Sequence, residues 1–168
     1  MYAKIYKLNY QYVLMKYGKN VDTELTLARK YARKGYVDNT LKHLSRAEES
    51  AAENGLDIAP DVGRVRDQVF KEYVKKELGS ARRKAGKGYV QPTETILQEV
   101  GDVLDINDAP QDIRDQFSNS STEVTSLAKE NAIKRLRKRA EYHRGAHNFN
   151  ALAEAEWELR ELETELTD

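Results

Sequence analysis

Two nearly identical stretches decide the fold: ARKYARKGYV at residues 28–37 and ARRKAGKGYV at residues 81–90. Both place alanines at helical spacing and then continue into Lys-Gly-Tyr-Val. A glycine after a helix adopts the left-handed conformation without steric cost, so Gly35 and Gly88 each indicate the end of one helix and a turn into the next. The sequence therefore predicts a helical hairpin that is written twice, 53 residues apart.

A second similarity lies downstream of each turn. Val65-Arg66-Asp67-Gln68 aligns with Ile113-Arg114-Asp115-Gln116, and the offset there has fallen to 48 residues. Pro60 and Pro110 stand just before these segments, where a helix tolerates proline. The alignment predicts a second copy that is shorter between its turn and Asp105.

A third, more divergent hairpin follows. Ser120 and Glu123 have the spacing of a capping box, which predicts a loop at 118–121 and a helix starting near residue 122. We expect helices near residues 2–17, 22–34, 38–54, 60–86 (with a break near Gly79), 92–104, 109–117, 122–144 and 148–166, and a helix cap at Asp38. The predicted fold is all-α: stacked helical hairpins in a short α-repeat array or a compact bundle. It forms one domain over 1–168, with a capping helix at 1–20, repeats at 22–76 and 77–119, and the divergent hairpin at 120–168.

The first hairpin resembles a tetratricopeptide repeat. Residues at that family's packing positions are Leu27, Ala28, Tyr31, Gly35, Thr40, Leu44 and Ala47. The second hairpin keeps Ala81, Thr93 and Leu97, but it has Lys84 in place of the tyrosine. The period of about 53 residues exceeds the family's roughly 34. The resemblance implies a helical-repeat protein that binds other proteins through its stacked hairpins.

Composition narrows the function classes. The 168 residues carry 28 Lys and Arg, 28 Asp and Glu and no cysteine, which excludes disulfides and thiolate chemistry. No apolar run approaches the roughly 20 residues that span a bilayer. We therefore expect a cytoplasmic protein with no membrane partner and no cofactor.

Motifs for catalysis are not apparent. The stretch from Gly79 to Gly88 has the wrong spacing for a phosphate-binding loop. His143 and His147 are four residues apart, but Gly145 interrupts their helix and no third ligand is evident, so no metal site is expected. The sequence predicts a protein without catalytic or cofactor-binding residues.

Charge is segregated by helix. Residues 24–34, 71–87 and 129–144 are rich in Lys and Arg, whereas residues 38–61, 94–115 and 150–168 are rich in Asp and Glu. The favoured interpretation is pairing between antiparallel neighbours. The alternative is a basic stripe that binds an acidic partner or the phosphates of nucleic acid, and its candidate residues are Arg29, Arg33, Arg82, Arg83, Arg135, Lys138 and Arg139.

Both ends of the chain are candidate self-association surfaces. The N-terminal segment is rich in tyrosine, and a leucine seam near the C-terminus comprises Leu152, Leu159, Leu162 and Leu166. The function that we expect is a protein-protein interaction module, with nucleic-acid binding as the alternative and a homo-oligomer as a further possibility.

Overall fold

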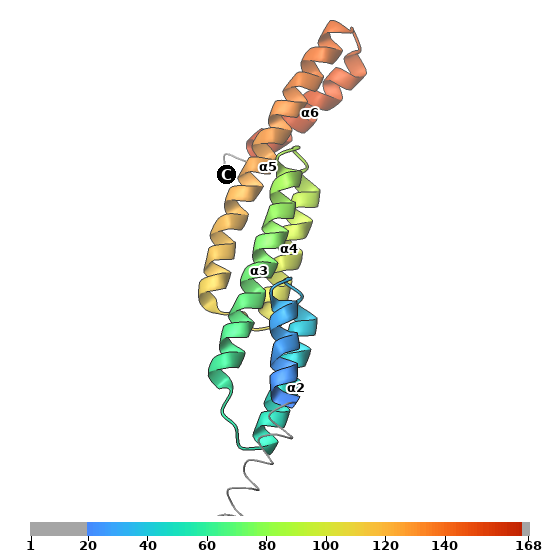
Figure 1. Ribbon diagram of the computed structural model, residues 1–168. Helices are drawn as coiled ribbons and strands as arrows, with labels where there is room; N and C mark the ends of the chain where they lie inside the picture. The colour runs from blue at the N-terminus through green and yellow to red at the C-terminus, as the bar shows by residue number, and fades with distance from the viewer. Residues whose placement is uncertain (1–19, 166–168) are drawn as a thin grey trace, which may run out of the picture. The chain divides into compact units, whose positions relative to one another are not determined.

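The computed structural model describes residues 20–165, and these form helices joined by short turns (Figure 1). A helix covers residues 20–32 and is followed by α2 (Val37–Glu53), α3 (Ala59–Ala85), α4 (Val90–Ile106), α5 (Gln111–Gly145) and α6 (Phe149–Thr164). No strand occurs among residues 20–165, so the all-α prediction is confirmed. None of these helices is long and apolar enough to cross a membrane. The expected capping helix at 1–20 and Leu166 lie outside the described residues, apart from residue 20, which belongs to the helix over residues 20–32.

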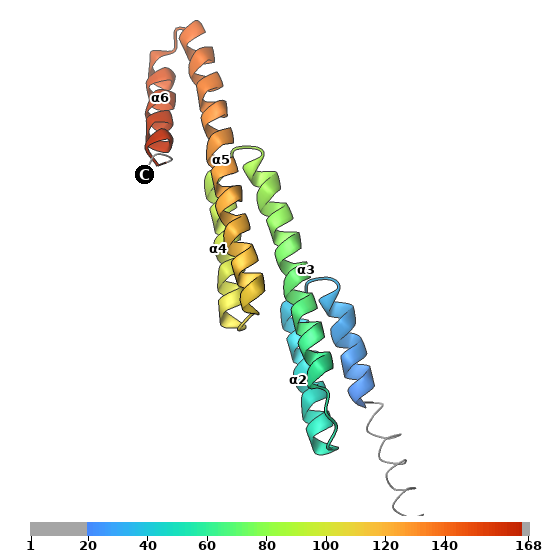
Figure 2. The same cartoon turned by 90° about the vertical axis from the view of Figure 1, so that its left-hand side faces the viewer.

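The chain divides into two compact units, one ending at Val74 and the other beginning at Lys75. In the first unit, the helix over residues 20–32 turns back into α2, and the N-terminal part of α3 packs on this pair. In the second unit, the C-terminal part of α3 turns back into α4, and α5 turns back into α6. Figure 2 shows α5 and α6 running side by side in opposite directions.

Three sequence-based boundaries are wrong. The expected loop at 118–121 is helical, and α5 is one helix of 35 residues. The hydroxyls of Ser121 and Thr122 both donate to the carbonyl oxygen of Ser118, which satisfies these groups inside the helix. Buried Phe117 and Val124 hold the helix to the core on either side. Ser120 therefore caps no helix, α3 has no break at Gly79, and α2 begins at Val37, one residue before the expected cap at Asp38.

The same turn closes every helix that ends among residues 20–165 before another begins. One residue adopts a positive φ, and the N–H of the next residue donates to the carbonyl oxygen five residues back, as in a Schellman motif. The residues with positive φ are Gly35, Gly55, Gly88, Asp108 and His147.

The turn positions also correct the downstream alignment. Gly55 and Asp108 are 53 residues apart, and α2 and α4 are both 17 residues long. The second copy is thus not shorter between its first turn and Asp105. Asp105 instead lies in the last turn of α4, whereas Asp57 follows the end of α2.

At Gly35 and Gly88 the backbone of the turn lies directly against a later helix, α3 at Gly35 and α5 at Gly88. A Cβ on Gly35 would lie 2.9 Å from the backbone nitrogen of Tyr73 in α3. A Cβ on Gly88 would lie 2.7 Å from the backbone nitrogen of Ala132 in α5. Both distances are shorter than a real Cβ contact permits, so only glycine allows the third helix of each unit to approach this closely.

The core is built from alanines and branched side chains along these contacts. Ala28, Ala32, Ala81 and Ala85 have no exposed surface, which lets neighbouring helices approach closely. Thr40 and Thr93 are also fully buried, and their hydroxyls donate to the carbonyl oxygens of Tyr36 and Tyr89 at 2.8 and 2.6 Å. The duplicated stretches therefore share one backbone conformation and the same buried alanines, and each is followed by the same threonine hydrogen bond.

Three glycine-to-alanine variants of the first unit separate backbone strain from overlap. Gly35→Ala combines a positive φ with overlap against Tyr73, and we expect it to lower the free energy of unfolding by about 3 kcal/mol. Gly55→Ala has a positive φ but nothing within 4 Å, and should cost about 1 kcal/mol. Gly63→Ala, in an open helical position, should be stabilising by about 0.5 kcal/mol. Urea unfolding followed by circular dichroism measures all three, and equal losses for Gly35→Ala and Gly55→Ala would contradict the close approach.

Candidate functional site

The seven basic candidates are divided between the two units. Arg29 and Arg33 belong to the first unit, and the other five belong to α3 and α5 in the second. Neither unit by itself therefore carries the whole stripe. The environment of each cation decides which of them is available to a ligand.

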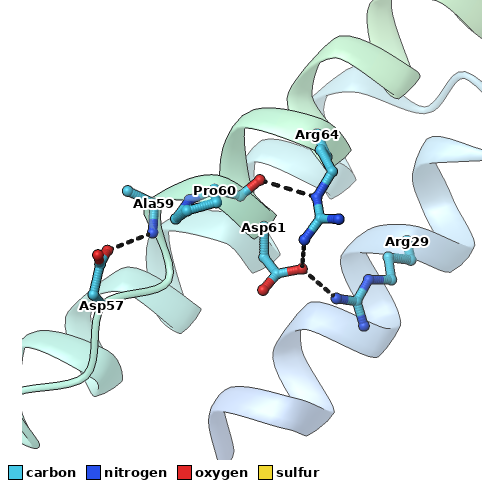
Figure 3. A network of polar contacts seen from close by, with 6 residues as sticks. All are labelled: Arg29, Asp57, Ala59, Pro60, Asp61 and Arg64. Carbon is cyan, nitrogen blue, oxygen red and sulfur yellow. Dashed lines mark hydrogen bonds and ion pairs between the residues drawn. The ribbon is translucent and has the colours of Figure 1, made fainter.

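Arg29 is engaged within the first unit. Its Nη2 lies 3.0 Å from Oδ1 of Asp61 in the first turn of α3, and Arg64 reaches the same oxygen at 2.9 Å (Figure 3). Asp61 is well placed for both, because a carboxylate at a helix N-terminus also meets the positive end of the helix dipole. Arg29 thus ties its helix to the first turn of α3, and Asp61 is the last residue of the acidic segment 38–61 that the charge pattern pairs with residues 24–34.

The predicted pairing of basic with acidic helices is present between α5 and α6. Arg139 contacts Glu154 at 2.9 Å and Glu158 at 3.3 Å. The other ion pairs across this interface are Arg137–Glu163, Arg144–Glu156 and Lys129–Glu165, at 2.8 to 2.9 Å. Arg139 is consequently a structural residue of the α5–α6 pair.

The remaining five candidates are exposed and take part in no ion pair among residues 20–165: Arg33, Arg82, Arg83, Arg135 and Lys138. Arg135 has a different partner. Its guanidinium lies 5.5 Å from the centroid of the Tyr89 ring, which is 41% exposed at the α3–α4 turn. A cation over an aromatic face is a favourable contact that leaves the positive charge accessible.

The leucine seam of α6 faces its neighbour in the same chain. Leu152, Leu159 and Leu162 are half-buried and share one side of the helix with Ala155, which is fully buried. Leu162 lines the same hollow as Ala132 and Leu136 of α5. These side chains therefore contribute to packing between α5 and α6.

The opposite side of α6 carries a second apolar face that the sequence reasoning missed. Phe149 is 70% exposed and Trp157 is 61% exposed, and exposed Ala153 lies between them at a spacing of four residues. The spacing itself was the available signal, because positions i, i+4 and i+8 lie on one side of a helix. We call Phe149, Ala153 and Trp157 the outer face of α6.

The exposure of Phe149 follows from its place after the turn. Val37, Val90 and Phe149 are the first residues of α2, α4 and α6. Val37 is only 6% exposed and Val90 is half-buried, since α3 and α5 pack beside their turns. Within the described part of the chain no helix follows α6, so Phe149 remains uncovered.

Neither comparison with known proteins nor the arrangement of metal-ligating side chains identifies a function. No protein-family model, no curated protein and no solved structure matches the chain. Among residues 20–165, no three or more His, Cys, Asp or Glu side chains are grouped so that they could hold a metal ion.

A double-mutant cycle tests the structural role of Arg139. Arg139→Gln and Glu154→Gln should show a coupling free energy of about 0.5 kcal/mol at low salt, because their ion pair is partly exposed. The coupling should decrease as salt screens the charges. The matched control is Lys138→Gln with Glu154→Gln, for which we expect no coupling; equal coupling in both cycles would show that the geometry of Arg139 is irrelevant.

Proposed function

We propose that this chain is a non-catalytic helical-repeat protein that binds another protein through the outer face of α6. The observation that carries the proposal is the exposure of Phe149 and Trp157 on one side of a helix whose other side already packs on α5. The apolar face of a helix is normally buried, so a second apolar face on a helix that is already packed is typical of a surface that a partner covers.

The chemistry of the face suits a protein partner. Aromatic side chains are enriched at the buried centres of protein interfaces, and tryptophan is among the commonest energetic hot spots. Trp157 also borders a shallow hollow of about 420 Å³ that Arg160, Glu161, Thr164 and Glu165 line. Polar side chains around an aromatic anchor are the usual rim of such an interface.

The duplicated geometry indicates where the partner would lie. In the first unit α3 covers the turn at Gly35, and in the second unit α5 covers the turn at Gly88. A partner helix beside α6 would cover the turn between α5 and α6 in the corresponding way. The tetratricopeptide-like pattern of the first hairpin supports the same class of function.

Nucleic-acid binding through the whole basic stripe is the less favoured alternative. Arg29 and Arg139 are neutralised by carboxylates, which removes two of the seven cations from the stripe. A second copy of the chain is another candidate for covering α6, and sedimentation velocity of the purified protein distinguishes it from a different partner.

The experiment compares capture of partners from an extract of the source cells. The variant with Phe149→Ser and Trp157→Ser should lose at least about tenfold of the captured partner, because it removes two anchors of the interface. Its thermal unfolding should remain close to that of the original chain, since both side chains are exposed.

Ile106→Ser is the matched control. Ile106 is 80% exposed at the end of α4, outside the outer face, and its substitution should leave capture unchanged. Undiminished capture by the double variant, or an equal loss with Ile106→Ser, contradicts the proposal.

A further inference from the structure

The internal duplication allows two copies of one structure to be compared position by position. Along α2 and α4 the identical residues are Val37/Val90, Thr40/Thr93 and Leu44/Leu97, all of them buried or half-buried. Every exposed position of α2 carries a different residue in α4. The N-terminal packing positions have thus been retained, whereas buried Ala47 and Ala51 are replaced by Val100 and Leu104 and the exposed residues all differ.

The turns before α2 and α4, in contrast, have identical exposed residues. Lys34 and Tyr36 are exposed and recur as exposed Lys87 and Tyr89. The two tyrosines are 45% and 41% exposed. The helices before the turns also keep one exposed residue, Arg29 and Arg82, whereas the exposed residues of α2 and α4 after the turns all differ. Exposed identity is thus confined to the turns and the helix ends that lead into them, which indicates that this surface has a role.

Helix capping does not explain the tyrosines. Tyr36 and Tyr89 occupy the N-cap positions of α2 and α4, and neither side chain makes a capping hydrogen bond. In the turn between α5 and α6, which is the third hairpin turn, Asn148 occupies the N-cap position. Its side chain accepts a hydrogen bond from the N–H of Ala151. An asparagine cap is worth about 1 kcal/mol, so both turns with tyrosine forgo stability that the third turn gains.

Each tyrosine ring has a cation over it, supplied by a different part of the chain. Lys34 Nζ lies 6.0 Å from the centroid of the Tyr36 ring, within the same turn. Arg135, from α5, lies 5.5 Å from the centroid of the Tyr89 ring. A cation in these turns also lies near the C-terminal end of the preceding helix, where it meets the negative end of the helix dipole. That effect requires no aromatic ring. The shared feature is therefore an exposed ring with an adjacent positive charge.

We propose that the two Lys-Gly-Tyr turns are equivalent binding sites for single-stranded nucleic acid, one in each unit. Tyr36 and Tyr89 stack on bases, and the neighbouring Lys34, Lys87 and Arg135 contact phosphates. Single-stranded nucleic acid is recognised by this combination of aromatic platforms and cations. An acidic peptide would use the cations but has no base to place on the rings. The inference goes beyond the proposed protein binding and concerns other residues.

Fluorescence anisotropy of labelled oligothymidylate and oligouridylate, with the full chain at low and physiological salt, tests this inference. Tyr36→Ala and Tyr89→Ala should each weaken binding by about tenfold, and the two together by more. Tyr36→Phe and Tyr89→Phe should retain binding, because the ring remains. Lys34→Gln and Lys87→Gln preserve both rings and should each lower the slope of log affinity against log salt by about one.

Tyr142→Ala provides the matched control. Tyr142 is 72% exposed on basic helix α5 but lies outside the Lys-Gly-Tyr turns, so its loss should leave affinity unchanged. Phe149→Ser with Trp157→Ser should also bind oligonucleotides normally, which separates this inference from the proposed protein interface. Circular dichroism melts establish that each variant is folded.

Four results would overturn the inference: no binding at low salt, undiminished binding by the two Tyr→Ala variants together, Tyr→Phe variants as weak as Tyr→Ala, or an equal loss with Tyr142→Ala. Competition by polyglutamate or by duplex DNA as effective as that by single strands would show that the turns read charge alone, and this also counts against the inference.

Discussion

Backbone-to-backbone contact at Gly35 and Gly88 is the constraint on which both units depend. Each glycine lies in the turn that ends one helix and reverses the chain. The backbone of a third helix lies against it, at a distance that a Cβ would prevent. The fully buried alanines in the same stretches extend this close approach along the helices. One short sequence therefore specifies a helix end, a reversal and a packing surface, which accounts for its recurrence where the same three-helix contact recurs.

The α5–α6 pair is held together differently. Among the described residues of α6 only Ala155 is buried, and three leucines are half-buried beside it. Ion pairs flank this narrow apolar seam, and partly exposed pairs of this kind contribute no more than about 1 kcal/mol each. We expect α6 to open at a lower free energy than the helices around Gly35 and Gly88. Binding of a partner to the outer face would stabilise α6 by mass action.

Most of the helices could be predicted from local pattern, because glycine turns and a 3.6-residue apolar period are local properties. The continuity of α5 could not, since Ser118 to Ser121 have the composition of a loop and are held helical by Phe117 and Val124 in the core. The partner of Arg29 lies within the predicted acidic segment 38–61, but the pairing was expected between helices adjacent in the chain, whereas Asp61 is in the first turn of α3. The spacing of Phe149 and Trp157 places both on one side of α6, but their exposure depends on what lies beside that helix, which the spacing does not reveal.

The positive φ of His147 has a consequence for any helix that docks beside α6. At this position the turns before α2 and α4 have Gly35 and Gly88, where a Cβ would overlap the backbone of α3 and of α5, respectively. His147 carries that Cβ, so a helix docking beside α6 has to stand farther from the turn than α3 and α5 do from theirs.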